Sequence, residues 1–468
     1  MDANKRGTFS SKLGFVLAAA GSAVGLGNIW RFPYLAANYG GGMFLLVYII
    51  LAASFGFTMI VTEAALGRMT KKSPVGAFRK VGAGPVLRVG GWINAVIPIL
   101  IVPYYSVIGG WVFKYLVQYI QGDHAKLACD NLAEGQTDFF TIFLGDAGQQ
   151  LLYFVLFTFI TMAIIFAGVK NGIEKISKIA MPILVVLCLI TVAFSVTRPG
   201  AMEGVKYFLV PDISHFSWKT VVAALGQMFY SLSIAMGILV TFGSYMQPEQ
   251  DIEASTRQVS IFDTAIAVMA GLMIIPAVFA YNGGEGLTKG PSLMFIAIPN
   301  VFNSMSFGRA IGIVFFLLVL FAALTSSVAL GESVVSTFCD ELKWGRRKAS
   351  VVTLVITLVL GSISALGFNI LSNVKILNMD LLSFFDFLTN NLMMPVAAIS
   401  TCILILRVVK LNKLEEEVLS SSKFRMRKFY RVVIKYFAIP FLIIILVTSV
   451  LGEIASAFDI KALMIFKL

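Results

Sequence analysis

Long uninterrupted apolar blocks constrain this chain more than any other feature of its sequence. Several blocks reach the length of roughly 20 residues that a helix needs to cross the hydrocarbon core of a bilayer. Their apolar residues are continuous and do not alternate with a period of two, as they would in a membrane β-barrel. Only 13% of the 468 residues are charged, about half the share of a soluble domain. The sequence therefore predicts an all-α integral membrane protein.

We predict about eleven transmembrane helices. The first apolar block follows Lys5, Arg6 and Lys12 but has no small-residue cleavage site, so it is interpreted as a true helix rather than a signal peptide. The predicted spans are 13–37, 42–68, 89–120, 149–168, 176–197, 218–245, 259–281, 305–338, 350–368, 381–406 and 432–456.

The distribution of basic residues predicts the orientation. With the N-terminus inside, the internal segments hold 26 of the 37 lysines and arginines. Basic residues concentrate on the cytoplasmic side of membrane proteins. We therefore expect a plasma or inner membrane protein with a cytoplasmic N-terminus and, given an odd number of helices, an external C-terminus. The same bias accounts for the net charge of +12 without a nucleic-acid partner.

Three connecting segments stand out. The polar segment 121–148 is predicted to be an external loop. In 282–304, glycines precede an apolar run at 293–301, which fits a short re-entrant or lid-like helix, although an ordinary surface loop is an alternative. The segment 407–435 is dense in lysine and arginine and is interpreted as a solvated cytoplasmic loop.

Three predicted helices contain glycine or polar residues that are unusual inside a membrane span. In the first, Gly21, Gly25 and Gly27 weaken the helix by about 1 kcal/mol each. Unwinding there would free carbonyls for a cation and amides for an anion, and Asn28 and Arg31 follow directly. The spacing of Gly21 and Gly25 also fits a helix-packing face, which is the alternative.

The sixth and eighth helices carry polar groups near their centres. Gln227 and Ser231 are four residues apart and share a face, and Ser233 follows them. In the eighth helix, Thr325 and Ser326 lie one turn beyond Ala322, which offers a carbonyl and two hydroxyls to a hard cation. Hydrogen bonding between or within helices is the alternative interpretation for both sets.

Asp263 falls within the predicted seventh helix. At membrane depth, an ionised carboxylate costs at least a few kcal/mol unless it has a partner. Asp263 is therefore a candidate functional residue, unless the helix starts later and leaves it at the interface.

These residues lie in motifs that resemble those of the neurotransmitter:sodium symporters, in particular bacterial amino-acid members. The resemblance covers nearly the whole chain, and its most specific part is the run from Gly25 to Tyr34. The other matching segments are Asn38–Gly42, Tyr104–Tyr105, Gln227–Ser233 and Leu324–Ser327.

The resemblance implies a fold of two inverted five-helix repeats, with broken helices 1 and 6 around the substrate, plus one extra helix. The expected repeats are residues 1–200 and 201–410. Residues 411–468 would form the basic loop and helix 11. The oligomeric state is left open.

The resemblance also implies two sodium ions and no organic cofactor. The first sodium site would use Ala23, Asn28 and Ser231, with Asp263 beside them. The second would use the Gly21, Val24 and Ala322 carbonyls with the Thr325 and Ser326 hydroxyls.

For the substrate, the resemblance implies that the Leu26 and Gly27 amides and the Tyr105 hydroxyl receive a carboxylate. Groups around the centre of the sixth helix would hold the ammonium, and apolar side chains would shape the pocket. The implied substrate-binding residues are Ala23, Leu26, Gly27, Ile101, Tyr105, Tyr230, Ser231, Ser233, Met236, Ser326 and Leu330.

Gly25 and Asp263 refine the expected substrate and ions. Monoamine members of the family place an aspartate at the position of Gly25, so a glycine implies an α-amino acid, and Met236 with the aromatic rings favours a hydrophobic or aromatic one. Tyr48, Gln227 and Ser231 match part of the family's chloride shell. Asp263 would supply the negative charge there, so transport is expected to be independent of chloride.

The gates follow from the same resemblance. Arg31 and Asp386 would form the outer pair, and Arg6 and Asp340 the cytoplasmic pair near Tyr245. Phe9 replaces the tryptophan common near that inner closure. Gly172 and Pro182 match a motif linked to unwinding of helix 5 and sodium release.

Two other classes remain as alternatives. A proton-coupled amino-acid permease would use Asp263 as its proton site, and a non-transporting amino-acid receptor would use only the binding pocket. The sequence shows no nucleophile–base pair and no metal cluster, so an enzyme is not expected.

Overall fold

The computed structural model describes residues 7–128, 137–283, 293–305, 307–458 and 460. These residues contain no β-strand, only an isolated bridge between Ile376 and Met379. The helices are α1 (Lys12–Ala23), α2 (Phe32–Asn38), α3 (Gly42–Leu51), α4 (Phe57–Thr70), α5 (Pro74–Lys80), α6 (Pro85–Gln121), α7 (Phe139–Gly145), α8 (Ala147–Phe166), α9 (Lys175–Val196), α10 (Ala201–Leu209), α11 (Trp218–Ser231), α12 (Ile238–Ser244), α13 (Ile252–Asn282), α14 (Ile298–Asn303), α15 (Gly308–Glu341), α16 (Arg346–Leu366), α17 (Leu381–Asp386), α18 (Met394–Ile403), α19 (Leu411–Leu419), α20 (Arg427–Val432) and α21 (Ala438–Phe458).

Short π-helical turns join several of these helices into longer spans. Their bounds are η1 (Gly27–Arg31), η2 (Ala52–Gly56), η4 (Val169–Glu174), η6 (Leu293–Ala297), η7 (Phe387–Met393), η8 (Leu404–Val409) and η9 (Val433–Phe437), and two short 3₁₀ helices are η3 (Asp123–Leu127) and η5 (Ile213–His215). In such a turn the backbone hydrogen bonds run from residue i to i+5, so they depart from the regular α-helical pattern.

Nine helices in the described residues are long and apolar enough to cross a membrane without a break. A tenth span is bent by 52° between Lys12–Ala23 and Gly27–Asn38. The predicted sixth helix is also interrupted, because α11 ends at Ser231 and α12 begins at Ile238. The described part of the chain thus holds nine unbroken spans and one bent span, and eleven spans if the α11–α12 pair is counted as one more. Helices 1 and 6 are the broken ones, as the sequence predicts.

The break between α11 and α12 contains backbone that glycine normally adopts. Ser233 has a φ of 54° and Ala235 a φ of 60°, both in the left-handed region. Each costs roughly 1–2 kcal/mol for a residue with a side chain. The Ala235 N–H donates to the Glu63 carboxylate of α4 at 2.8 Å, and Ser233 Oγ donates to the Ser22 carbonyl at 3.1 Å. These tertiary hydrogen bonds stabilise the unwound segment.

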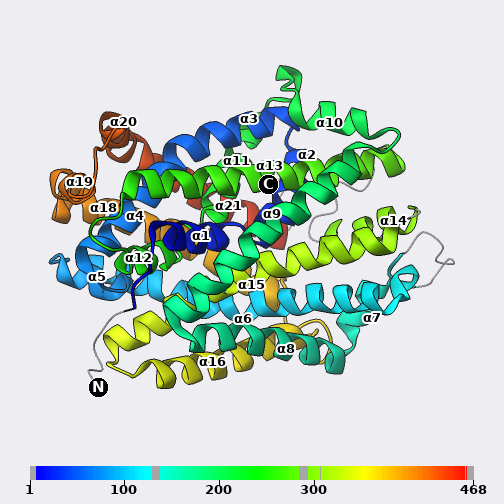
Figure 1. The fold of residues 1–468 in the computed structure, drawn as a ribbon, viewed down its shortest axis with the longest axis horizontal. Helices are drawn as coiled ribbons and strands as arrows, with labels where there is room; N and C mark the ends of the chain where they lie inside the picture. The colour runs from blue at the N-terminus through cyan, green and yellow to red at the C-terminus, as the bar shows by residue number, and fades with distance from the viewer. Residues whose placement is uncertain (1–6, 129–136, 284–292, 306, 459, 461–468) are drawn as a thin grey trace.

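The helices run along the long axis of the molecule (Figure 1). The described N-terminal end lies at one end of the bundle with α5, α12, α19 and α20, and α7, α10 and α14 lie at the opposite end. The segments that the sequence assigns to the cytoplasm therefore share one end.

The structure corrects one interpretation of the connecting segments. Residues 407–435 do not form a simple solvated loop, because α19 folds against α4 with Leu414 and Val418 fully buried. These two side chains are four residues apart and share one face of α19. Glu415 is buried beside them and is paired with Arg427 and Arg431.

Two other segments follow the predictions more closely. A short helix covers η6 and α14, with Leu293 and Met294 fully buried, as expected for the apolar run at 293–301. The helix predicted at 259–281 begins earlier, at Ile252, because the Asp251 side chain caps it by accepting from the Ala254 N–H. Asp263 therefore lies well inside a membrane span.

Candidate functional site

A small cavity of about 30 Å³ lies where the two broken helices meet. Its lining comes from the first, third, sixth and eighth spans. The residues are Ser22, Ala23, Gly25, Gly27, Asn28, Ile101, Tyr105, Tyr230, Ser231, Ser233, Met236, Ile238, Ser326 and Leu330. Ten of the eleven expected substrate residues are among them. Leu26 is the exception, and its N–H donates to the Tyr105 hydroxyl at 3.2 Å.

Ser22 and Ile238 also line the cavity and were not singled out from the sequence. Ser22 belongs to the break in the first span, and its hydroxyl lies 3.2 Å from Ser233 Oγ. Ile238 is the first residue of α12, directly after Gly237. The sequence signal that could have identified both residues is their position next to a glycine at a helix break.

Two glycines hold the cavity open. A Cβ atom at Gly25 would stand 2.6 Å from Ser326 Oγ and 2.9 Å from the Tyr105 hydroxyl oxygen. A Cβ atom at Gly27 would stand 2.6 Å from the ring of Tyr230. Real Cβ atoms do not approach so closely, so a side chain at either position would require Ser326, Tyr105 or Tyr230 to move. The space at Gly25 is bordered by hydroxyl groups suited to a small anionic group.

Asp263 is the centre of a buried polar cluster beside this cavity. Its Oδ1 accepts from Asn28 Nδ2 at 2.7 Å and from Ser231 Oγ at 2.9 Å. Its Oδ2 accepts from the Tyr48 hydroxyl at 3.0 Å. All four side chains are at most 2% exposed. The donors to this buried carboxylate are neutral and leave its negative charge unbalanced, which suits a cation.

A second group of oxygens gathers between α1 and α15. Ser326 Oγ lies 3.2 Å from the Gly21 carbonyl oxygen and 3.4 Å from that of Val24. Thr325 Oγ1 lies 3.1 Å from the Ala322 carbonyl oxygen. The break after Ala23 leaves carbonyls of the first span without helical partners. Neutral carbonyl and hydroxyl oxygens of this kind are typical ligands of an alkali cation.

The two residues of the predicted outer gate, Arg31 and Asp386, do not form an ion pair in the structure. Arg31 Nη1 instead donates to Gln227 Oε1 at 3.1 Å, and its guanidinium carbon lies 5.2 Å from the centre of the Tyr230 ring. Asp386 accepts from Asn390 Nδ2 at 2.6 Å. Gln227 Nε2 donates to the Gly27 carbonyl at 3.0 Å, so this side chain links Arg31 to the break in the first span.

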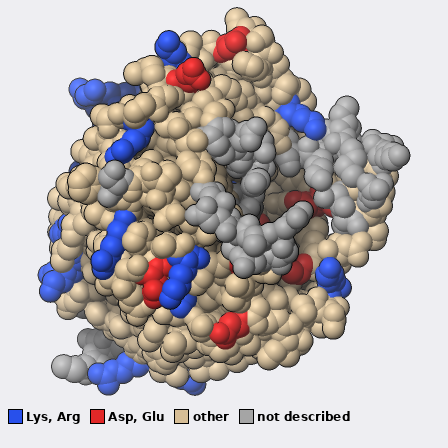
Figure 2. Space-filling model, turned by 90° about the vertical axis from the view of Figure 1, so that its right-hand side faces the viewer, with Lys and Arg blue, Asp and Glu red and all other residues tan. Residues whose placement is uncertain are grey.

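A second recess lies next to these groups. The face at the end of the molecule opposite the N-terminus shows acidic side chains beside a hollow (Figure 2). A cavity of about 630 Å³ here is lined by Trp30, Trp111, Asp380, Asp386 and Glu453, among others. It borders Asp386 and therefore leads towards the position of the predicted outer gate.

Phe9 and Tyr245 lie together at the position of the predicted cytoplasmic closure. Phe9 is fully buried, and its N–H donates to the Tyr245 carbonyl at 3.1 Å. The Tyr245 hydroxyl donates to Glu332 Oε1 at 2.7 Å, and Arg346 pairs with the same carboxylate at 2.6 Å. Glu332 and Arg346 were not predicted from the sequence, although a glutamate inside an apolar helix is itself a signal.

Arg6 lies outside the described residues, so the structure describes only Asp340 of the predicted Arg6–Asp340 pair. Asp340 Oδ2 accepts from the Ser73 N–H at 2.6 Å, and Lys72 Nζ lies 3.7 Å from its Oδ1. Asp340 therefore lies at the C-terminal end of α15, next to the turn between α4 and α5.

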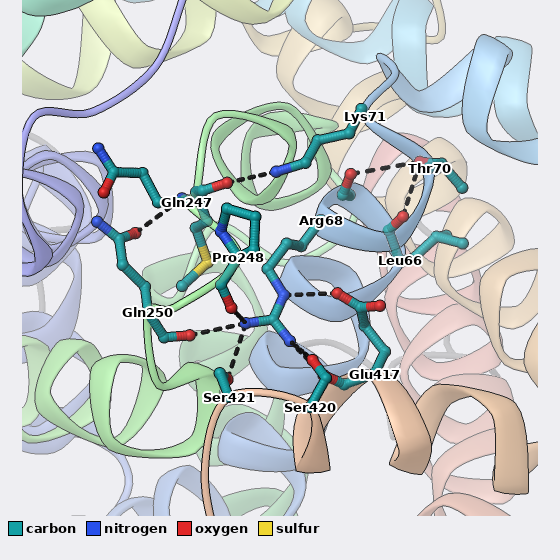
Figure 3. A network of polar contacts seen from close by, with 12 residues as sticks. Leu66, Arg68, Thr70, Lys71, Gln247, Pro248, Gln250, Glu417, Ser420 and Ser421 are labelled. Atoms are coloured by element: carbon teal, nitrogen blue, oxygen red, sulfur yellow. Dashed lines mark hydrogen bonds and ion pairs between the residues drawn. The ribbon is translucent and has the colours of Figure 1, made fainter.

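Arg68 organises the C-terminal end of the second span (Figure 3). Its side chain is 1% exposed and pairs with Glu417 Oε1 at 2.6 Å. It also donates to the Gln250 carbonyl at 2.7 Å and to Ser420 Oγ and Ser421 Oγ. One guanidinium thus ties α4 to the loop after α12 and to the end of α19.

The proposed release motif lies at the start of the fifth span. Gly172 is in the π-helical turn η4, and a Cβ atom there would collide with the Ile164 carbonyl oxygen. Pro182 lies inside α9, where it cannot donate a backbone hydrogen bond. Both features weaken regular helix in this region.

Comparisons with known proteins show the family and the fold of the chain. The model of the Sodium:neurotransmitter symporter family matches residues 6–137 and 136–459. An uncharacterized sodium-dependent transporter of Bacillus subtilis is 33% identical over 97% of this chain and 99% of its own length. One from Haemophilus influenzae is 32% identical over 95% of this chain and 98% of its own length.

Among solved structures, MhsT in complex with L-phenylalanine matches with a TM-score of 0.85 and 35% identity. The match covers 95% of this chain and 100% of MhsT. The predicted fold class is confirmed, and the protein is a multi-pass membrane transporter rather than an enzyme. The chain belongs to the sodium:neurotransmitter symporter family.

Proposed function

We propose that this protein imports hydrophobic or aromatic L-amino acids together with two sodium ions and without chloride. The observation that carries the proposal is the open position at Gly25, which lies between the Tyr105 and Ser326 hydroxyls and next to the buried Asp263 cluster. A substrate carboxylate in that space would lie beside the first sodium ion.

The pocket composition supports the substrate class. Ile101, Met236 and Leu330 are apolar, and Tyr230 adds an aromatic wall. The Leu26 N–H and the Tyr105 hydroxyl already bond to each other and are the groups proposed to receive the carboxylate. The similar transporter MhsT was solved with L-phenylalanine, which favours the same class here.

The two oxygen clusters support two sodium ions. Ala23, Asn28, Ser231 and Asp263 would hold the first ion, and Gly21, Val24, Ala322, Thr325 and Ser326 the second. Asp263 brings a fixed negative charge into the first cluster. Chloride is then not needed to balance the charge of sodium, because the protein itself supplies it.

Coupling would follow from the two broken spans. Sodium and substrate bound at both breaks would stabilise an occluded state, because each ligand contacts more than one span. Loss of the second ion to the cytoplasm would free the α1–α15 contact and loosen the region of Gly172 and Pro182. A membrane potential of 100 mV adds about 2.3 kcal/mol for each net charge moved inward.

The proposed orientation places the N-terminus, α5 and α19 in the cytoplasm and the C-terminus outside. The proposed repeats remain residues 1–200 and 201–410, followed by 411–468. The shared position of α5, α12 and α19 at one end of the bundle supports this arrangement.

The test of substrate class is competition for uptake into proteoliposomes. Labelled leucine or tryptophan is supplied under an imposed sodium gradient, and unlabelled amino acids and monoamines compete. Competition by hydrophobic and aromatic amino acids alone supports the proposal. Competition by monoamines would contradict the role given to Gly25, and uptake driven by a proton gradient would favour the permease alternative.

A further inference from the structure

An apolar groove of about 450 Å³ opens on the outside of the bundle between the second and seventh spans. Ile49, Ala53 and Phe57 line one wall at intervals of four residues, so they share one face of their helix. Ile49 is 40% exposed, and Ile261 on the facing wall is 62% exposed. In a membrane-spanning chain, such a groove faces lipid rather than water.

The seventh span supplies the other wall. Its groove residues are Arg257, Ser260, Ile261, Thr264 and Ala265, and Met426 covers one end. From Arg257 to Ala265 the helix rises about 12 Å, at 1.5 Å per residue. This is close to half of the roughly 30 Å hydrocarbon core, so the groove has the length of one leaflet.

The backbone beneath the groove departs from regular helix. The π-helical turn η2 lies in the second span at this level, and Ser260 Oγ donates to the Ala52 carbonyl at 3.4 Å. Single π-helical turns in α-helices frequently occur at functional sites. The groove is therefore associated with a specific irregularity of the chain.

Arg257 lies at the end of the groove near the cytoplasmic loops and is exposed. Glu253, one turn earlier, is the residue expected to pair with it. However, both oxygens of Glu253 accept backbone N–H groups instead, from Arg425 at 2.6 Å and from Met426 at 3.2 Å. Among the described residues, Arg257 has neither an ion pair nor a side-chain hydrogen bond.

A second basic side chain, that of Arg425, belongs to the same end of the groove. The Arg425 N–H donates to the carboxylate of Glu253, which lies one helical turn before Arg257, and the Arg425 side chain is exposed. No acidic residue lines the groove among the described residues. The groove thus combines an apolar channel with a positive charge at its membrane–water end that forms no ion pair among the described residues.

We propose that this groove is a binding site for an anionic phospholipid. One acyl chain lies between the second and seventh spans, and the phosphate group contacts Arg257, with Arg425 adding to the positive field. Anionic headgroups are attracted by about 1 kcal/mol for each basic residue near the membrane surface. Thr264 lines this site and is adjacent in sequence to Asp263, so the lipid lies on the outer side of the helix that carries the sodium-site carboxylate.

The test is native mass spectrometry of the full chain after release from nanodiscs. The nanodiscs contain equal amounts of phosphatidylglycerol and phosphatidylcholine with identical acyl chains. We expect the wild type to retain phosphatidylglycerol preferentially. Arg257→Gln should lower that preference roughly fivefold, and Arg257→Lys should keep most of it. Ala53→Leu, which narrows the groove without changing charge, should lower retention of phosphatidylglycerol.

The matched control is Arg347→Gln. Arg347 is exposed at the start of α16, on the same side of the membrane, and has no partner among the described residues. It lines none of the cavities described above, so its loss should leave lipid selectivity unchanged. Equal retention of both lipids by the wild type would overturn the proposal, as would equal losses in the Arg257 and Arg347 variants. Because lipid binding is measured directly, the result does not depend on the transported substrate.

Discussion

Asn28 Nδ2 lies 2.7 Å from Asp263 Oδ1, which joins the break in the first span to the middle of the seventh across 235 positions of sequence. Ser231, at the end of α11, donates to the same oxygen. Three spans thus meet at one carboxylate oxygen. A cation bound there would bridge the first and sixth spans, the two that are broken.

Asp263→Asn should weaken sodium-driven uptake. The substitution removes the fixed charge from the cluster, and hydrogen bonds to charged groups contribute roughly 1.5–3 kcal/mol. The half-saturating sodium concentration should therefore rise about tenfold or more. External chloride should partly restore uptake by the variant, whereas replacing chloride with gluconate should leave the wild type unchanged. Loss of wild-type uptake in gluconate would contradict this role.

An exposed carboxylate provides the control for that variant. Asp212 lies in the loop before α11 and hydrogen bonds only within its own turn, to Ser214. Asp212→Asn should leave both the sodium and the chloride dependence unaltered.

Gly25→Ala should lower the affinity for substrate. The added methyl group would occupy the space between Ser326 Oγ and the Tyr105 hydroxyl that is proposed for the carboxylate. Overpacking of a tight site typically costs about 1–3 kcal/mol, so the apparent affinity should fall roughly 5- to 150-fold. Scintillation proximity binding of a labelled amino acid measures it.

Gly226→Ala is the control for this change. Gly226 is in α11, and a Cβ atom there would meet nothing within 4 Å. Its substitution should leave binding intact. Equal binding by the Gly25→Ala and wild-type proteins would show that the carboxylate lies elsewhere.

Arg68→Gln should destabilise the fold. The change leaves several carbonyls and hydroxyls of two segments, the loop after α12 and the end of α19, without their shared donor (Figure 3). Removing one partner of a buried ion pair costs about 3–5 kcal/mol. Arg68→Lys should restore only part of the lost stability, because an ammonium has three donors and lacks the planar donor geometry of a guanidinium. Unfolding in detergent, followed by thiol labelling of buried Cys402, measures the loss.

Arg79 offers a comparison on the same side of the protein. It forms an ion pair with Glu341 at 2.8 Å in which the arginine side chain is 52% exposed and the glutamate side chain 7% exposed. Arg79→Gln should cost less than Arg68→Gln, because the guanidinium of Arg79 is partly hydrated and that of Arg68 is not. Similar losses for the two variants would contradict the structural role given to Arg68.

Glu415 gives a prediction about pH. Burial alone would raise the pKa of its carboxyl, but hydrogen bonds from Arg431 and Arg427 outweigh burial and hold the pKa below the ordinary value of 4.5. The group therefore contributes stability above pH 4.5, and this contribution is lost as the pH falls through the depressed pKa.

Glu415→Gln should accordingly lower the unfolding temperature at neutral pH and have progressively less effect in acid. Parallel melting curves of wild type and variant between neutral pH and the acid limit of solubility measure this. A difference that stays constant with pH would show that the carboxylate charge is not the source of the stability.

Much of the fold could be predicted from the sequence, because apolar block length depends directly on bilayer thickness. The breaks at Gly21–Asn28 and around Ser233 are visible as glycine and polar residues inside apolar blocks. The Asp263 cluster could be predicted in part, since a carboxylate inside a span needs partners. Residue spacing does not indicate that Tyr48 is one of these partners, and only the family resemblance brings Tyr48 to this site.

The remaining features depend on tertiary packing. The basic composition of 407–435 favoured a solvated loop, but Leu414 and Val418 dock on α4 and their burial outweighs the charged surroundings. Several ion pairs join residues on different helices, and no local sequence pattern indicates such partners. They are the pairs formed by Glu332, Arg346 and Arg68. The direct Arg31–Asp386 contact is absent because Arg31 lies against Tyr230 and Gln227 instead.

The most direct test of sodium-coupled amino-acid transport is uptake of labelled leucine or tryptophan into proteoliposomes. An imposed sodium gradient is compared with a matched potassium gradient at constant pH, and Ser326→Ala is measured beside the wild type. Ser326 Oγ lies within 3.4 Å of three carbonyl oxygens of the first span, those of Gly21, Ser22 and Val24. We predict accumulation that requires sodium and is lost in the variant. Accumulation that is equal in potassium, or that persists unchanged in Ser326→Ala, would contradict the account.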